Sequence, residues 1–257
     1  MVTQNKEEFT VKKMVVAALI MAVISMMSLA AFAAETVITE FDASDIDAFM
    51  QQVDLSNYNV PMSALSKVSR GVKVDCPEGA YAQNFRIVDS ETLTAFNAFV
   101  NGSNEYLRIY VNNQAPNAIG LYIAPYDADG KSVFFDCRKA VLIGTNGSKP
   151  KIETGDGGGA GANTSLMIPS GFKGYAIFTL ADLTLQDSGF DVSKALHHLE
   201  IDVRNAQGGS YILGKLMAVD SAAAPAEEPS TTADVSMLAY AASAVLACGA
   251  LMLQKKK

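Results

Sequence analysis

Three segments of the chain alternate between apolar and polar residues, and the polar positions hold side chains suited to carbohydrate. The segments are residues 106–111, 119–123 and 199–204, and the same alternation is extended to Tyr126 and His198. Alternate residues of an extended strand point to opposite faces, so inward Leu, Ile and Val residues place the polar ones outward. These are Tyr106, Arg108, Tyr110, Tyr122, Tyr126, His198, Glu200, Asp202 and Arg204. Tyrosine rings stack on sugar rings, while carboxylates and arginines exchange paired hydrogen bonds with hydroxyls. If the three strands are neighbours, the sequence predicts a glycan-binding patch.

An alternative interpretation of the same pattern needs no ligand. Tyr, Arg and Glu suit the half-exposed face of any antiparallel strand. The chain also has no tryptophan, which is the residue that most often stacks on sugars. The outward residues therefore form either a ligand site or an ordinary solvent-facing surface.

No motif predicts catalysis or a metal site. His197 and His198 are the only histidines, and adjacent strand residues point to opposite faces, so we expect their rings to lie apart. The segment Asp127–Gly130 begins like a calcium loop, but Ser132 and Arg138 occupy the positions that require Gly and Glu. It is interpreted as a hairpin turn. Glycosidase chemistry needs only two carboxylates, so a hydrolase with an unrecognised carboxylate pair stays open.

The cysteines leave two alternatives. Cys248 lies in an apolar run near the C-terminus, which leaves Cys76 and Cys137 as the pair that could form a disulfide. Closing a loop of about 60 residues would stabilise the fold by about 4 kcal/mol. The other alternative is two separate thiols.

The residue pattern predicts an all-β fold. Further short runs rich in Val, Ile, Phe and Tyr occur at residues 36–41, 71–75, 132–136, 140–144, 174–180 and 210–219. Only Ala43–Gln52 has helical spacing, with Asp42 or Ser44 as its N-cap. About nine strands and one short N-terminal helix predict a single β-sandwich domain over residues 34–220.

The N-terminal residues 1–33 have the composition of a secretory signal peptide. The basic pair Lys12–Lys13 precedes the apolar run Met14–Phe32, and the small-residue pattern Ala31–Ala33 marks a cleavage site. An uncleaved signal anchor is the alternative. Either interpretation predicts export of the domain.

The C-terminal residues predict a membrane anchor. A linker rich in Ala, Pro and Glu (221–234) precedes the apolar run Val235–Leu253, which as a helix would span about 28 Å, close to the thickness of a bilayer core. The basic tail 254–257 would remain cytoplasmic. We therefore expect the domain on the extracytoplasmic face of the cell envelope.

This end of the chain resembles the cell-wall sorting signal of Gram-positive surface proteins. That signal combines a Pro-x-Thr-Gly motif, an apolar segment and a basic tail. Pro229, Thr231 and Thr232 occupy the motif region, but Thr232 stands where the family has Gly. The resemblance implies a sortase-type transpeptidase as a partner and covalent attachment to the wall, with a plain membrane anchor as the alternative.

The central domain resembles carbohydrate-binding modules of the galactose-binding-like jelly-roll class. The resemblance rests on the order of four segments: Tyr106–Asn112, Ile168–Tyr175, Leu199–Val203 and Gly209–Leu213. Many such modules end in an Asp-Asp pair that helps to hold structural calcium, but here the corresponding residues are Leu213–Leu216. Glu40, Asp42 and Asp220 could supply oxygen ligands, but they fall short of the roughly six that a calcium site needs, so a structural calcium is kept only as the alternative. We therefore expect no cofactor.

Taken together, the sequence predicts a surface-tethered, non-catalytic module that binds a wall or environmental polysaccharide. The alternative is a structural or adhesive surface protein that binds another protein and has no sugar site. The chain holds 27 acidic against 20 basic side chains. An acidic surface repels phosphate backbones, so nucleic acid is not expected as a partner.

Overall fold

The computed structural model describes residues 35–39, 41, 53–54, 64–79, 82–156, 161–186, 189–191, 194–223 and 225 of the 257-residue chain. The predicted signal peptide, the helix 43–52, the apolar run 235–253 and the sorting residues Pro229, Thr231 and Thr232 lie outside these ranges. Within them, no helix is long and apolar enough to span a membrane. The chain divides into two compact units, Met1–Ala222 and Ala223–Lys257, and every described strand belongs to the first.

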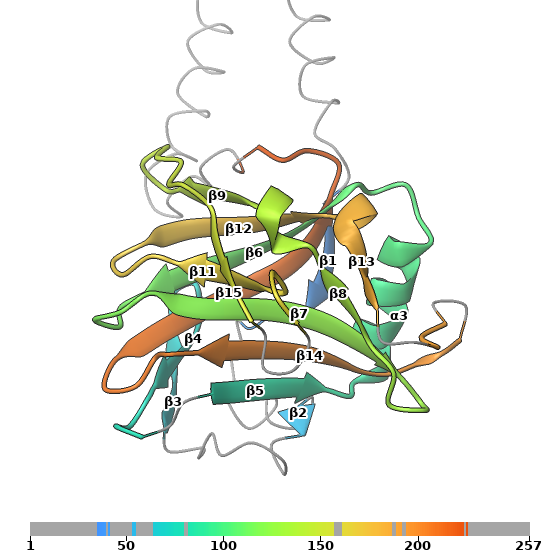
Figure 1. Ribbon diagram of the computed structural model, residues 1–257, viewed down its shortest axis with the longest axis horizontal. Helices are drawn as coiled ribbons and strands as arrows, with labels where there is room; N and C mark the ends of the chain where they lie inside the picture. The colour runs from blue at the N-terminus through green and yellow to red at the C-terminus, as the bar shows by residue number, and fades with distance from the viewer. Residues whose placement is uncertain are drawn as a thin grey trace, which may run out of the picture. The chain divides into compact units, whose positions relative to one another are not determined.

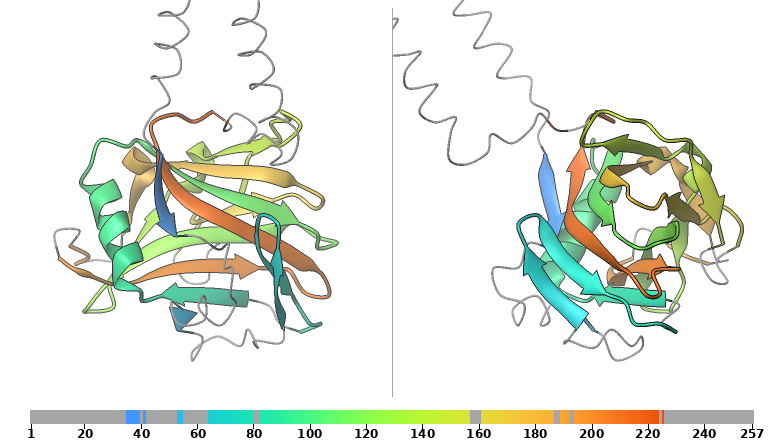
Figure 2. Two further views of the ribbon diagram at one scale, coloured as in Figure 1. Left: turned by 180° about the vertical axis from the view of Figure 1, so that it is seen from behind. Right: turned by 90° about the vertical axis from the view of Figure 1, so that its left-hand side faces the viewer.

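Two antiparallel sheets form a β-sandwich, and they curve around a common interior (Figures 1 and 2). The first sheet has the order β3 (Leu65–Val68), β4 (Gly71–Asp75), β15 (Ser210–Val219), β6 (Tyr106–Asn113), β12 (Lys173–Thr179) and β9 (Val141–Gly144), and β1 (Thr36–Thr39) also pairs with β15. The second has the order β10 (Glu153–Gly155), β11 (Ser165–Ile168), β7 (Ile119–Asp127), β14 (Leu196–Arg204), β5 (Ala82–Ile87) and β2 (Val53–Asp54). The all-β sandwich prediction is confirmed.

The chain passes repeatedly from one sheet to the other. Strands β5, β7, β11 and β14 lie in the second sheet, while β6, β9, β12 and β15, which alternate with them along the chain, lie in the first. A small third sheet pairs β8 (Val133–Phe135) with β13 (Leu183–Gln186). The short 3-10 helix η2 (Cys137–Lys139) follows β8, and a second one, η3 (Leu180–Asp182), precedes β13. Successive strands therefore face each other across the interior more often than they pair.

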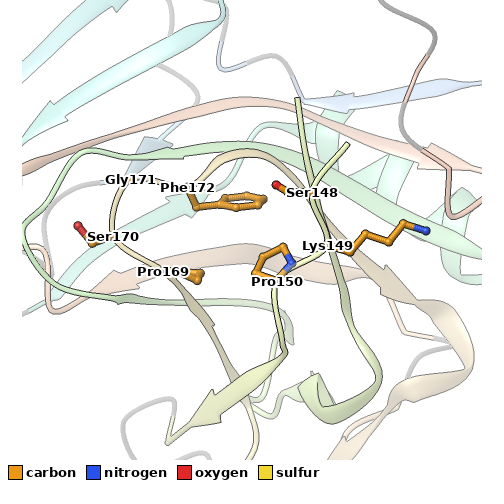
Figure 3. Close-up of a pocket in the computed structure, with 7 residues that line it drawn as sticks. All are labelled: Ser148, Lys149, Pro150, Pro169, Ser170, Gly171 and Phe172. Atoms are coloured by element: carbon orange, nitrogen blue, oxygen red, sulfur yellow. The ribbon is translucent and has the colours of Figure 1, made fainter. Parts of the chain in front are cut away.

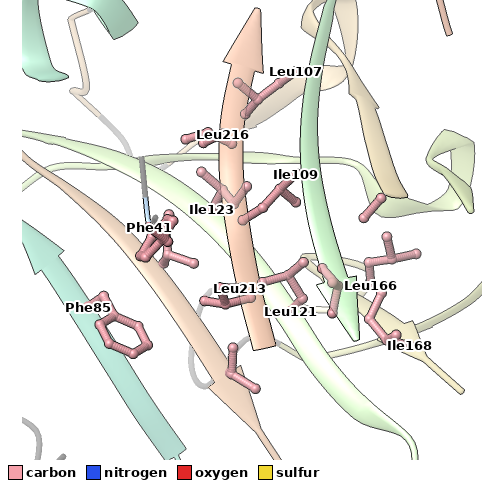
Figure 4. Close-up of a cluster of buried hydrophobic side chains, with 14 of the residues drawn as sticks. Phe41, Phe85, Leu107, Ile109, Leu121, Ile123, Leu166, Ile168, Leu213 and Leu216 are labelled. Atoms are coloured by element: carbon pink, nitrogen blue, oxygen red, sulfur yellow. The ribbon is translucent and has the colours of Figure 1, made fainter. Parts of the chain in front are cut away.

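The core lies between the sheets and follows the alternation in the sequence. The inward residues that the pattern predicts are all buried: Leu107, Ile109 and Val111 on β6, Leu121 and Ile123 on β7, and Leu199, Ile201 and Val203 on β14. Side chains from both sheets meet there (Figure 4). Burial of each Leu, Ile or Val side chain contributes about 1.5–3 kcal/mol to folding, so the alternation fixes which face of each strand points outward.

A helix that the sequence analysis did not predict covers one side of the sandwich. Helix α3 (Ser90–Val100) begins at Asp89, whose carboxylate accepts a hydrogen bond from the main-chain N–H of Thr92 at 2.8 Å. Its buried residues Thr92, Phe96 and Phe99 are spaced for one helical face. The helix packs against β1 and β14. The prediction of one helix, at residues 43–52, was therefore incomplete.

Candidate functional site

The structure divides the nine predicted site residues between the two sheets. Tyr106, Arg108 and Tyr110 lie on β6 in the first sheet, whereas Tyr122, Tyr126, His198, Glu200, Asp202 and Arg204 lie on β7 and β14 in the second. The predicted patch depended on the three strands being neighbours, and this condition holds for β7 and β14 but not for β6. The cause is topological, because the chain crosses to the other sheet between β6 and β7.

The β6 residues are engaged with neighbours on the first sheet. Arg108 is buried and donates a hydrogen bond to Glu35 Oε1 at 2.7 Å, and its guanidinium lies 5.5 Å from the centre of the Tyr175 ring. Tyr110 meets the Tyr175 ring edge-on, with 5.6 Å between the ring centres. Burial raises the pKa of the Tyr110 hydroxyl. These contacts describe a packed layer of aromatic and cationic groups.

The other six predicted residues share one face of the second sheet. In the strand register, His198 lies opposite Tyr126, and Asp202 lies opposite Tyr122. On the other side of β14, β5 places Arg86 opposite Glu200 and Asn84 opposite Asp202. We call this set the polar face: Asn84, Arg86, Tyr122, Tyr126, His198, Glu200, Asp202 and Arg204.

Asn84 and Arg86 were missed by the sequence analysis. They belong to β5, which was not predicted as a strand. A signal was present, since Asn84 and Arg86 alternate with the buried Phe85 and Ile87. The alternation spans only a few residues after the turn residues Glu78 and Gly79, and this is too short to predict a strand.

Glu200 is the best-connected carboxylate of the polar face. The Tyr122 hydroxyl donates a hydrogen bond to Glu200 Oε1. His198 Nε2 and an Arg86 terminal nitrogen lie 3.7 Å and 3.9 Å from Glu200 Oε2. Burial opposes ionisation of Glu200, but His198, Tyr122 and Asn84 outweigh it and hold the pKa below its usual value. Glu200 is therefore a stable anion within the fold.

Asp202 has a different environment, although it lies only two residues away on the same face. Arg204 Nε donates a hydrogen bond to Asp202 Oδ2 at 2.7 Å. Burial dominates over this contact and raises the pKa of the carboxyl group to about 6. The charge on Asp202 therefore changes within a mildly acidic range, whereas Glu200 remains ionised.

Four buried polar atoms on this face have no hydrogen-bond partner within the described part of the chain. They are Asn84 Oδ1, Arg86 Nε, His198 Nε2 and Asp202 Oδ1. An unsatisfied buried polar group costs about 1–3 kcal/mol, and most buried polar groups in native proteins are satisfied. The four atoms lie on one sheet face and keep unused capacity to donate or accept hydrogen bonds.

Aromatic residues border the polar face. The Tyr126 ring stacks on the His198 imidazole, with ring centres 4.4 Å apart and an angle of 11° between the planes. Four residues earlier on the same face of β7, the Tyr122 ring meets the Phe134 ring of β8 edge-on, with 5.7 Å between the ring centres. The Arg204 guanidinium lies 5.6 Å from the centre of the Tyr122 ring. Strand β8 thus packs against one side of the polar face through Phe134.

The two histidines do not lie apart as the sequence analysis expected. Their Nδ1 atoms are 2.9 Å from each other, although His197 is exposed and His198 is buried. The pairing of β14 with β7 shifts between Leu196 and His198. Such an irregularity turns adjacent side chains away from strict alternation. No group of three or more metal-binding side chains occurs among the described residues.

A separate shallow pocket of about 340 Å³ lies between the turn after β9 and the turn joining β11 to β12 (Figure 3). Its lining residues are Ser148, Lys149, Pro150, Pro169, Ser170, Gly171 and Phe172. Asn113 Nδ2 supports this region by donating to the carbonyl oxygens of Ile168 and Pro169, each at 3.0 Å. None of the nine predicted site residues lines the pocket.

Cys76 and Cys137 are separate in the structure. Both are buried and neither forms a disulfide, and burial raises the pKa of each thiol to about 12. Of the two alternatives for these cysteines, the structure contains the pair of unlinked thiols.

The Asp127–Gly130 segment forms the predicted turn. The Gly130 N–H donates to the Asp127 carbonyl at 3.1 Å, and Asp127 Oδ1 accepts hydrogen bonds from the N–H groups of Asp129 and Lys131, each at 2.9 Å. The Asp127 side chain thus organises the turn itself.

Comparison with known proteins adds no relative from which a function could be transferred. No protein-family model, no curated protein and no solved structure matches the chain.

Proposed function

We propose that this protein is a non-catalytic carbohydrate-binding module of the jelly-roll type, held at the extracytoplasmic face of the cell envelope, and that it binds glycan through the polar face. The observation that carries the proposal is the convergence of four buried, unpartnered polar atoms with a stacked aromatic pair on one sheet face. The passage of the chain between the two sheets supports the jelly-roll assignment.

The polar face matches the hydrogen-bonding needs of a sugar. Asn84 Oδ1 and Asp202 Oδ1 can accept hydrogen bonds from hydroxyl groups, while Arg86 Nε can donate to hydroxyl or ring oxygens. Tyr126 presents a half-buried ring beside them. Protein sites that bind polar ligands combine a few such groups with aromatic contact area.

Binding is favoured over hydrolysis by the way the two carboxylates are held. Glycosidases use an acid and a base that reach the scissile bond from two sides. Here Glu200 Oε1 already accepts a hydrogen bond from the Tyr122 hydroxyl, and both Glu200 and Asp202 are buried. Arg204 Nε likewise donates a hydrogen bond to Asp202 Oδ2, so neighbouring side chains already engage both carboxylates.

The proposed location rests on the two ends of the sequence. Residues 1–33 have the parts of a signal peptide, and residues 235–257 have those of an anchor with a basic tail. Attachment to the wall by a sortase-type transpeptidase would use Thr231 or Thr232. Peptide mass spectrometry of the C-terminus from whole cells tests this, because recovery of the intact tail through Lys257 would show that no such processing occurs.

A titration of the full-length protein in mild detergent against wall and dietary polysaccharides tests the binding function. We expect saturable binding that weakens about five- to twelvefold in Tyr126→Ala, because loss of one ring contact is worth about 1–1.5 kcal/mol. Tyr175→Ala on the first sheet is the matched control and should bind normally.

Three outcomes would contradict the proposal. Absence of binding to every glycan would leave the protein-binding alternative. Loss of binding in Tyr175→Ala alone would move the site to the first sheet. Release of reducing sugar during the titration would show that the protein is a hydrolase.

A further inference from the structure

We infer that the ligand of the polar face is an acidic glycan, in which sugar hydroxyls meet Asn84 and Asp202 while sugar carboxylates meet Arg86 and Arg204. The inference rests on the proposed function and adds the charge of the ligand. It concerns what an incoming molecule meets first on this face.

The two arginines are the outermost charges of the polar face. The exposed fraction of the Arg86 side chain is 21% and that of Arg204 is 16%, against 6% for Glu200 and 2% for Asp202. The carboxylates therefore lie beneath the guanidinium groups. A ligand that approaches the face encounters positive charge before negative charge.

Neither arginine is saturated by its carboxylate. The closest approach of Arg86 to Glu200 is 3.9 Å, which is longer than a hydrogen bond, and Arg86 Nε has no partner among the described residues. Arg204 uses its Nε–H to donate a hydrogen bond to Asp202 Oδ2. A guanidinium has five N–H donors in a planar fork that matches a carboxylate. Both side chains thus retain capacity for an anionic group.

The spacing along the strands separates the two positive positions. Arg86 lies opposite Glu200, and Arg204 follows Glu200 by four residues. At about 3.3 Å per residue, the two arginines are about 13 Å apart along β14. Asn84 and Asp202 lie opposite each other in register between them, each with an unpartnered acceptor oxygen. These oxygens need hydrogen-bond donors, which hydroxyl groups supply and carboxylates do not.

The net negative charge of the protein does not prevent this. The whole chain has a formal net charge of −7, but exposed charges are screened beyond about 8 Å at physiological ionic strength. A carboxylate in contact with Arg86 or Arg204 is governed by that contact. We therefore expect binding of an acidic glycan to weaken as salt is added.

Ionisation within the polar face gives a second expectation. The groups that act on the Asp202 carboxylate are Arg204 and Glu200 of β14, Tyr122 of β7 and Tyr211 of β15, and Asn84 of β5 lies opposite Asp202 in the strand register. Protonation of Asp202 removes the negative charge next to Arg204, so an acidic glycan should bind more tightly at pH 5 than at pH 7.

The test compares polygalacturonate with its fully methyl-esterified form, which keeps the remaining hydroxyls but has no charge. With the full-length protein in mild detergent, we expect the charged polymer to bind about ten- to a hundredfold more tightly, as for a charged hydrogen bond. Arg86→Gln and Arg204→Gln should each remove most of that difference, and Arg86→Lys should retain part of it. The control Lys173→Gln removes the same charge from the first sheet and should have no effect.

Each outcome separates the inference from the proposed function. Equal binding of the charged and esterified polymers would overturn the inference and leave glycan binding intact. Equal binding of polygalacturonate and polyphosphate, which has no sugar hydroxyls, would overturn the role of Asn84 and Asp202. Failure of every glycan to bind would overturn the proposed function itself. Thermal unfolding of each variant shows whether a loss of binding arises from unfolding. If Arg204→Gln does not fold, the milder variant Arg86→Lys still tests whether binding depends on the arginines.

Discussion

The Tyr126 ring lies nearly parallel to the His198 imidazole, with ring centres 4.4 Å apart. The contact joins β7 to β14 at opposed positions of the register. Because His198 also approaches Glu200, the stack positions one side of the polar face.

The stack should contribute measurably to stability. Tyr126→Ala removes it and should lower the free energy of unfolding by about 1 kcal/mol beyond the loss of buried area. Tyr126→Phe keeps the ring and should retain the stacking contribution. Urea unfolding of the two variants measures the difference. Equal destabilisation by both would mean that the hydroxyl, and not the ring, makes the important contact.

The stability of the fold should depend on pH through Asp202. Its pKa rises from 3.8 when unfolded to about 6 when folded, so between these values the folded state binds more protons. Stability from this group is therefore present below about pH 4 and is lost as pH rises through about 6, by up to about 3 kcal/mol. Glu200, whose pKa is lowered, acts in the opposite direction and loses its contribution as pH falls below its unfolded value of 4.5.

The variant Asp202→Asn tests this assignment. Urea unfolding at pH 5, 6 and 7 should show the wild-type protein losing stability relative to the variant as pH rises. A constant difference between the two proteins across this range would show that Asp202 has an ordinary pKa in the folded state.

Two glycines with positive φ should respond differently to alanine. A Cβ on Gly71, at φ +145°, would lie 1.9 Å from the Leu213 carbonyl oxygen, whereas a Cβ on Gly79, at φ +96°, would meet nothing within 4 Å. Gly79→Ala should cost only the backbone strain, about 1–2 kcal/mol. Gly71→Ala should cost about 3 kcal/mol or more, because β4 and β15 must also separate. Denaturant midpoints of the two variants provide the comparison, and similar values would contradict the close approach at Gly71.

The two buried thiols should remain unlinked and unreactive in the folded protein. Their raised pKa values leave almost no thiolate at neutral pH, and the thiolate is the reactive form. Native protein should react slowly with an alkylating reagent, and protein unfolded in urea without reductant should be alkylated at both Cys76 and Cys137. A linked peptide containing both cysteines would contradict this prediction.

Much of the strand pattern could be predicted from the sequence because burial alternates strictly there. Residues 71–75 and 210–219 match β4 and β15 at both ends, and the inward set on β6, β7 and β14 is confirmed. Strands β2, β3, β5, β10, β11 and β13 were not predicted, because each is too short to show more than one or two alternations. Helix α3 was missed because a Phe and Thr pattern has weak helix propensity, and its formation depends on packing against β1 and β14.

The grouping of the site could be predicted only in part. Alternation decides which way a side chain points, and this placed six residues correctly on one face of β7 and β14. It does not decide which strands pair, so the position of β6 could not be known from Tyr106, Arg108 and Tyr110. The same limit hid Asn84 and Arg86, whose place beside Asp202 and Glu200 depends on a partner strand more than 100 residues away.

The repeated passage of the chain between the two sheets has a consequence for how the protein folds. Strand β5 pairs with β14, and β6 pairs with β15, so the central pairings join strands that lie about 100 to 120 residues apart in the chain. Neither sheet can be completed until β14 and β15 have been synthesised. Folds dominated by such distant pairings close slowly, in roughly milliseconds to seconds. A chain that is exported before it folds would remain extended through translocation, and would assemble both sheets only after its last strands had crossed the membrane.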